Sequence, residues 1–114
     1  MLRATSGRLG NVAGTRPIIP KVLTMRTIHK QNLTIQDRQT IEVPEGADLL
    51  SIQIQRNSAR VWYLCNDDNP KETVVIHCRG TGHPMPDGNL FHIGTTQHNY
   101  GNLVFHWFED AQRA

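Results

Sequence analysis

From Met25 onward the chain is a series of short apolar segments separated by turn-forming residues, and this pattern restricts the fold more than any other feature. The segments predicted to be strands are MRTIHKQ (25–31), QTIEV (39–43), LLSIQIQ (49–55), RVWYLC (60–65), ETVVIHC (72–78), LFHIGTT (90–96) and LVFHWF (103–108). Their lengths are those of ordinary strands, and none continues with the period of a helix. The pattern predicts an all-β fold, a single small antiparallel β-sandwich or barrel of about seven strands.

Strict alternation predicts which side chains share a face of a sheet. The groups expected to share a face are Leu50, Ile52 and Ile54; Val74, Ile76 and Cys78; and Leu103, Phe105 and Trp107. His77 and Cys78 are adjacent, so they are expected on opposite faces and unable to hold one ion together. Either face of the last strand can be the exposed one, since apolar residues occupy both.

Length and charge divide the 114 residues into an arm and one domain. Residues 1–24 carry four basic residues and no acid, whereas residues 25–114 carry eight basic against ten acidic residues, a net charge of −2. A mildly acidic domain argues against a nucleic-acid-binding core, which needs clustered cations. No apolar run approaches the roughly 18–20 residues of a membrane span. The predicted organisation is a basic extended arm at 1–24, a β-domain at 25–110 and a tail at 111–114.

Three interpretations of residues 1–24 remain open. The segment has the basic, acid-free composition of a transit peptide, but Gly10, Gly14, Pro17 and Pro20 interrupt the amphipathic helix that such a peptide needs. It is a flexible tail, an extension upstream of a natural start at Met25, or an extended arm that orders against a partner. In the last case its partner-binding residues are Arg3, Arg8, Arg16 and Lys21.

Cys65 and Cys78 lie in different predicted strands, without a CxxC motif or a signal peptide. We expect both to be free, buried thiols in a reducing compartment.

The stretch HCRGTGHPMPDG (77–88) is the densest group of functional residue types in the chain. Gly80 and Gly82 allow positive φ, the prolines fix φ, and Asp87-Gly88 is a turn pair. A phosphate-binding loop would need a helix behind the GTG, and HPMPDG cannot continue as one. We therefore predict a rigid connection between strands, with His83 at its tip or tucked beneath it.

The histidines lack metal-ligand spacing, because no two of the six stand at HxH or HxxxH. His77, His92 and His106 line one face only if their strands are neighbours, and half-exposed strand histidines are the simpler expectation. His83 and Asp87 resemble a base and its orienting acid, but no nucleophile in a strained turn accompanies them. No catalytic residue, metal ligand or cofactor is predicted.

Several segments together resemble the signature of small uncharacterised proteins of tailed bacteriophages and prophages. These segments are Pro44–Gln53, Trp62, Gly80–Asp87, His92–Thr95 and Leu103–Glu109. The resemblance covers residues 26–109, and members of that group commonly begin near the equivalent of Met25. It implies a phage or prophage origin and expression inside a bacterial cell, and it carries no catalytic role.

These observations predict a non-enzymatic protein-binding module, most specifically a virion-associated accessory protein such as a head-decoration or minor structural protein. One alternative is a host-takeover or anti-defence factor that binds a bacterial protein or nucleotide. A second is a metal-dependent hydrolase, which requires ligands from among His77, His83, Asp87 or His92 to converge. The expected location is the virion or the cytoplasm of the infected host, with protein partners and no membrane contact. The candidate binding residues are Trp62, His83, Pro84, Met85, Asp87, Tyr100 and Trp107.

Overall fold

Seven antiparallel strands make up the part of the chain that the structure, a computed structural model, describes, residues 25–114. The strands are β1 (Arg26–Leu33), β2 (Arg38–Pro44), β3 (Asp48–Gln55), β4 (Ser58–Asn66), β5 (Lys71–Gly80), β6 (Leu90–His98) and β7 (Leu103–Asp110). Each predicted segment falls on one of them, so the all-β prediction is confirmed. Residues 25–114 contain no helix of the length and hydrophobicity that a membrane crossing requires.

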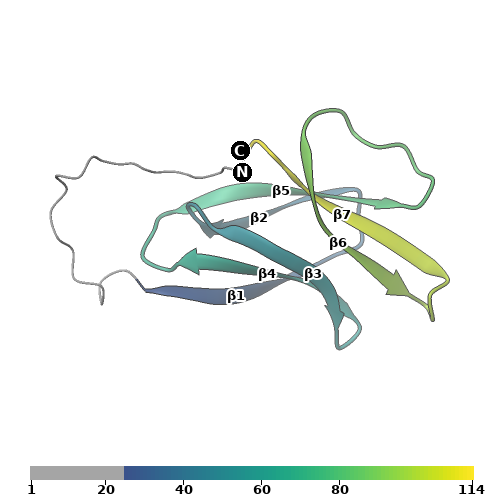
Figure 1. The fold of residues 1–114 in the computed structure, drawn as a ribbon, viewed down its shortest axis with the longest axis horizontal. Helices are drawn as coiled ribbons and strands as arrows, with labels where there is room; N and C mark the ends of the chain where they lie inside the picture. The colour runs from purple at the N-terminus through teal and green to yellow at the C-terminus, as the bar shows by residue number, and fades with distance from the viewer. Residues whose placement is uncertain (1–24) are drawn as a thin grey trace, which may run out of the picture.

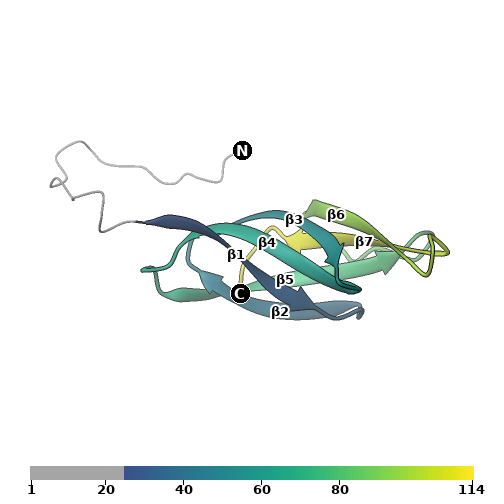
Figure 2. The same cartoon turned by 90° about the horizontal axis from the view of Figure 1, so that it is seen from below.

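The strands form two sheets, of order β1-β4-β3 and β2-β5-β7-β6. Figures 1 and 2 show the sheets stacked face to face, with β3 and β6 running side by side at one margin. Consecutive strands β3–β4 and β6–β7 pair as hairpins, whereas β1 and β2 pair with strands further along the chain. The result is a β-sandwich, in which each sheet buries one face against the other.

The inner faces of the two sheets supply the core. Its most deeply buried apolar side chains are Val43, Ile52, Val61, Val74, Ile76 and Trp107. Cys78 belongs to this core, and its neighbour His77 lies on the opposite face of β5, as alternation predicted. Burying each large apolar side chain stabilises the fold by about 1.5–3 kcal/mol, so these residues carry most of the favourable energy.

The predicted alternation of β3 is wrong at Leu50. The register between β3 and β4 shifts between Leu49 and Ser51, so Leu49 opposes Tyr63 and Ser51 opposes Trp62. This β-bulge inserts one extra residue into β3. As a result Leu49 and Ile52 both face the core, and Leu50 is left 48% exposed. A regular apolar–polar alternation does not predict a bulge, because a bulge depends on how β3 pairs with β4, and a single segment of sequence does not contain that pairing.

The β3–β4 hairpin turns through Arg56 and Asn57, both with positive φ (51° and 67°). Positive φ at both central residues is the requirement of a type I′ turn, whose twist matches that of the paired strands. Asparagine tolerates this conformation better than most residues, so the RNS sequence is compatible with the tight turn.

Gly94 permits the closest approach between the sheets. A Cβ atom at this position would lie 2.6 Å from the backbone oxygen of Ile52, well inside van der Waals contact. A register shift between His92 and Gly94 marks a second irregularity at this point of β6. The seam between β3 and β6 therefore depends on the absence of a side chain at residue 94.

The segment 111–114, predicted to be a tail, is tied to the sandwich by Arg113. Its guanidinium donates to Glu109 Oε2 (2.8 Å from Nη2), to Glu72 Oε2 (2.7 Å) and to the carbonyl of Ala47 (2.6 Å). Glu109 is 2% exposed. Burial acts to lower the pKa of Arg113, but the hydrogen bonds and charges of Glu72 and Glu109 outweigh it and raise the pKa. This ion cluster, the Arg113 clamp, joins β7, β5 and the β2–β3 turn.

Candidate binding surfaces

The loop after β5 crosses the outer side of the four-stranded sheet. It leaves at Gly80, level with Phe105 of β7, and returns at Leu90, level with Asp110 at the other end of β7. Figure 1 shows it arching on the side away from β1, β4 and β3. Backbone contacts fix both ends, because the amide of His83 donates to the carbonyl of Gly80 and the amide of Ala111 donates to that of Asn89.

Of the three glycines in the loop motif, Gly82 (88°) and Gly88 (105°) have positive φ. They therefore act as turn residues, as the sequence predicts. Gly80, which the sequence marked only as able to adopt positive φ, does not adopt it. Its role is close approach: a Cβ atom would lie 3.0 Å from the His83 ring. The imidazole of His83 is therefore folded back against Gly80, while the residue stays exposed.

The histidine face is the outer face of the four-stranded sheet and includes His77, His92, His106 and Phe108. Because β7 lies between β5 and β6, Phe108 opposes His77 on one side and His92 on the other. The rings of His92 and Phe108 pack edge to face, 5.3 Å apart. The three histidines therefore line one face, the arrangement that the sequence left open.

Threonine hydroxyls connect this face to the loop. The Thr95 hydroxyl is hydrogen-bonded to His92 Nε2 (2.9 Å) and His106 Nδ1 (3.1 Å), and Thr81 in the loop is hydrogen-bonded to His106 Nε2 (2.7 Å). Arg79 Nε donates to the carbonyl of Pro84 (3.0 Å). The loop thus supplies a hydrogen-bond partner for His106, and His106 and His92 are joined through the Thr95 hydroxyl.

His77 is the least accessible member of the histidine face, 7% exposed. Its Nε2 lies 3.5 Å from Asp110 Oδ2, and its buried Nδ1 has no hydrogen-bond partner within residues 25–114. The four residues of the hydrolase alternative do not form a three-donor group: in the described part of the chain only His29, Cys65 and Asp67 bring metal-ligating atoms within 4.8 Å of one another.

The tryptophan face is the outer face of the three-stranded sheet and includes Ile28, Leu50, Trp62 and Leu64. Ile28 opposes Leu64, and the bulged Leu50 neighbours Ser51, the partner of Trp62. Ile28 is 56% and Leu50 48% exposed. Ile28 and Leu64 are thus direct cross-strand neighbours, a kind of pair that interacts across an antiparallel sheet.

Cations lie beside the apolar residues of the tryptophan face on β1 and β4. Arg26 and Lys30 alternate with Ile28 on β1, and Arg60 precedes Trp62 by two residues on β4. Lys30 Nζ donates to the amide oxygen of Gln55 (2.7 Å), and Arg60 donates to that of Asn32. These contacts are to neutral groups, so the positive charge of both side chains stays unneutralised by them.

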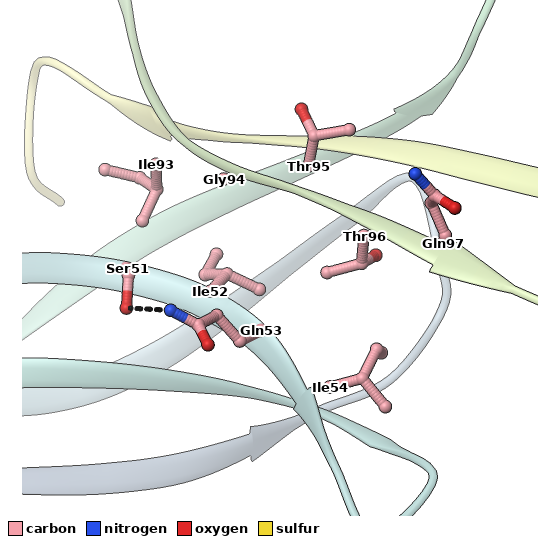
Figure 3. A pocket seen from close by; sticks show the side chains of 9 residues that line it. All are labelled: Ser51, Ile52, Gln53, Ile54, Ile93, Gly94, Thr95, Thr96 and Gln97. Atoms are coloured by element: carbon pink, nitrogen blue, oxygen red, sulfur yellow. Dashed lines mark hydrogen bonds between the residues drawn. The ribbon is translucent and has the colours of Figure 1, made fainter. Parts of the chain in front are cut away.

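A groove of about 570 Å³ follows the seam between β3 and β6. Its lining residues are Ser51, Ile52, Gln53, Ile54, Ile93, Gly94, Thr95, Thr96 and Gln97. Figure 3 shows Ile52 between the two strands and Thr95 pointing away from β3. None of the nine residues is titratable, so the groove offers hydrogen bonds and apolar contact but no acid–base chemistry.

The predicted binding residues lie far apart on the structure. Trp62 is on the tryptophan face, whereas the loop residues His83, Pro84, Met85 and Asp87 lie over the opposite face of the sandwich. Tyr100 is fully exposed at the tip of the β6–β7 turn. Trp107 is wholly buried, and its indole N–H donates to the Thr96 hydroxyl (2.9 Å). Trp107 is a core residue and cannot contact a partner. The arm residues Arg3, Arg8, Arg16 and Lys21 lie outside the described residues.

The residues that the sequence did not single out are Ile28 and Leu50 of the tryptophan face, Gly94 and Arg113. Only Gly94 carries a sequence signal, a glycine inside a strand, which often marks close backbone approach.

Comparison with known proteins identifies a family of unknown function. Residues 25–114 match the family described as domain of unknown function DUF7352. The match covers most of the chain, which therefore belongs to this family. Curated proteins and solved structures gave no match.

Proposed function

We propose that this chain is a non-enzymatic protein-binding module that docks through its tryptophan face. The observation that carries the proposal is the exposure of apolar side chains on the outer face of the three-stranded sheet. Ile28 on the edge strand β1 and Leu50 on the edge strand β3 remain about half exposed, on either side of the half-buried Trp62 and Leu64 of the central strand β4. An exposed apolar patch with an aromatic residue and a charged rim has the composition of a protein interface.

Charge selects the partner. Arg26, Lys30 and Arg60 give the rim a positive character, and the only acidic side chain facing outward from these strands is Asp48. A second copy of the same face would bring like charges together, which disfavours a symmetric dimer through this surface. The partner is therefore an acidic protein surface with an apolar centre.

The finer proposal is that the partner is a virion component and the chain a virion-associated accessory protein. Its support is the resemblance to small phage proteins and the basic, acid-free composition of residues 1–24. The alternative of a host-takeover factor shares the docking surface and differs in the partner.

The docking surface is tested with two variants matched in exposure. A photo-crosslinking amino acid replaces Leu50 (48% exposed) on the tryptophan face or Met85 (47% exposed) in the loop of the opposite face. We expect position 50 to crosslink one protein in the producing cell, with competition by unlabelled chain. Position 85 should give no such product.

The captured protein is then purified and its affinity measured. Trp62→Ser should weaken binding by at least about tenfold, since buried tryptophans at interfaces commonly contribute more than 1.4 kcal/mol. Raising the salt concentration should weaken it further, because exposed charges are screened. Equal crosslinking from both positions, or an affinity unchanged by Trp62→Ser, would overturn the docking surface. The virion assignment is tested separately by mass spectrometry of purified particles, and absence of the chain from them would reject it.

A further inference from the structure

The inner side of β1 and β4 brings three different metal-binding side chains together at the end of the sandwich away from the 81–89 loop. His29 lies on β1 opposite Tyr63, Cys65 lies two residues further along β4, and Asp67 follows in the loop. Figure 1 shows the beginning of β1 beside the end of β4. Asp67 is the first residue of the turn after β4, and this turn brings its carboxylate back toward the Cys65 sulfur.

The donor atoms are close enough to share one ion. His29 Nε2 lies 2.7 Å from Asp67 Oδ1, the Cys65 sulfur lies 3.9 Å from the same oxygen, and all three donors are within 4.8 Å of one another. Ligands of a tetrahedral zinc ion stand about 3.4–3.6 Å apart, given bond lengths of about 2.0–2.3 Å. An ion would therefore widen the His29–Asp67 contact by less than about 1 Å.

The donor set selects the class of metal. A thiolate and an imidazole bind borderline and soft divalent ions, whereas Mg²⁺ and Ca²⁺ prefer oxygen ligands alone. Three protein ligands leave one tetrahedral position for water or a fourth donor. The sulfur is fixed by the fold, because Cys65 is only 4% exposed, while His29 and Asp67 are about half exposed. This combination keeps one ligand rigid and leaves the other two room to adjust.

We propose that His29, Cys65 and Asp67 form a zinc-binding site. The proposal departs from the expectation that the chain binds no metal, and it is independent of the docking surface on the outer face. The Cys65 thiol gives its proton to solvent as its sulfur binds the ion, so binding releases one proton. The bound ion ties the edge strand β1 to the loop after β4.

The competing explanation is a surface ion pair between His29 and Asp67, with the Cys65 thiol donating weakly to the carboxylate. Burial, and then the charge of Asp67, raises the pKa of Cys65. The two explanations differ in whether the sulfur ever coordinates an ion, and a spectroscopic probe of metal–sulfur bonding distinguishes them.

The experiment uses the full 114-residue chain and Co²⁺ as a coloured substitute for Zn²⁺. We expect tetrahedral d–d bands and a near-ultraviolet sulfur-to-cobalt charge-transfer band at one equivalent, both abolished by adding Zn²⁺. Calorimetry with Zn²⁺ in buffers of different ionisation enthalpy should show release of about one proton, because the ligands bind in their deprotonated forms.

The matched control is the second buried cysteine. Cys65→Ser should remove the charge-transfer band and weaken Zn²⁺ binding more than about 100-fold, since loss of a ligand's outer partners alone costs about 10- to 100-fold. Cys78→Ser should leave the band and the affinity unchanged. Asp67→Asn should weaken binding but keep the band. Circular dichroism checks that each variant is folded, and Asp67→Asn provides an exposed change if Cys65→Ser unfolds. A missing band in the wild type, or loss of the band in Cys78→Ser while that variant is folded, would overturn the site.

Discussion

The two outer faces of this sandwich are built from the same strand geometry but differ in the side chains that they expose to solvent. The histidine face is crossed by the chain's own loop, and His92 and His106 on it are hydrogen-bonded to the hydroxyls of Thr81 and Thr95. The tryptophan face leaves Ile28 and Leu50 about half exposed. The difference between the two faces is therefore one of chemistry, hydrogen-bonded polar groups against exposed apolar side chains, and the proposed docking surface rests on it.

The comparison of the two faces requires that the sandwich stays folded as one unit. Disrupting the Arg113 clamp is expected to have the largest effect on its stability. Arg113→Ala removes the cation that lies 2.8 Å from the carboxylate of Glu109, a side chain only 2% exposed. Breaking a buried ion pair from one side typically costs about 3–5 kcal/mol. We expect a loss of that size in the free energy of unfolding by urea. Gln112→Ala, an exposed change in the same segment, should have almost no effect. Equal effects of the two variants would mean that the clamp does not stabilise the fold.

The seam between the sheets is the next most sensitive point. Gly94→Ala places a Cβ atom 2.6 Å from the carbonyl oxygen of Ile52, so the backbone of β3 or β6 must move. Overpacking of this kind costs about 1–3 kcal/mol, and contact with backbone favours the upper end. Gly46→Ala is a useful control, because its Cβ would meet nothing within 4 Å and only its positive φ (82°) opposes the change. If Gly94→Ala were the milder variant in thermal unfolding, the seam would be looser than described.

Alkaline pH should weaken the core between the faces. Burial, assisted by Asp37, raises the pKa of Cys78 to about 11 from an ordinary value of 9.0. The folded state therefore keeps its thiol proton after the unfolded state has lost it. This contribution is fully present below pH 9 and is lost as the pH rises toward 11, by about 2–3 kcal/mol. Urea unfolding at pH 8 and pH 10.5 measures the loss, and Cys78→Ala should show a smaller alkaline decrease. A decrease of the same size in the variant would assign it to other groups.

The smallest effects compare the faces directly. Gly82→Ala strains a loop position with φ of 88° and should cost about 1 kcal/mol. Ile28→Ser on the tryptophan face removes an exposed apolar side chain and should change stability by less than about 0.5 kcal/mol. Thermal unfolding of both variants checks the order. The reverse order would mean that the tryptophan face is buried in the free protein and the loop is dispensable.

Sequence patterns predicted the number and positions of the strands because apolar alternation and turn residues are local signals. The pattern of β5 placed Val74 and Ile76 on one face and His77 on the other, and the structure shows that the first of these faces is the core. It failed at Leu50, because a bulge is a property of two paired strands, and at Trp107, because alternation alone does not say which face is the core.

The candidate sites were less predictable than the fold. His29 and Cys65 are separated by 36 positions in the chain, so no spacing motif could join them, and only the antiparallel register of β1 and β4 does. The histidines were recognised as possible neighbours, but their hydrogen bonds to threonines required the order β5-β7-β6.

The sequence by itself determined that this chain forms short antiparallel strands with a buried apolar core and a rigid glycine- and proline-bounded loop. Those features follow from side-chain size, alternation and φ preference, which act within a few residues. The tertiary structure decided which outer face the loop covers, which face stays apolar and exposed, and which distant donors meet at the end of β4. Those outcomes depend on strand order and register, which are set by the packing of the whole core.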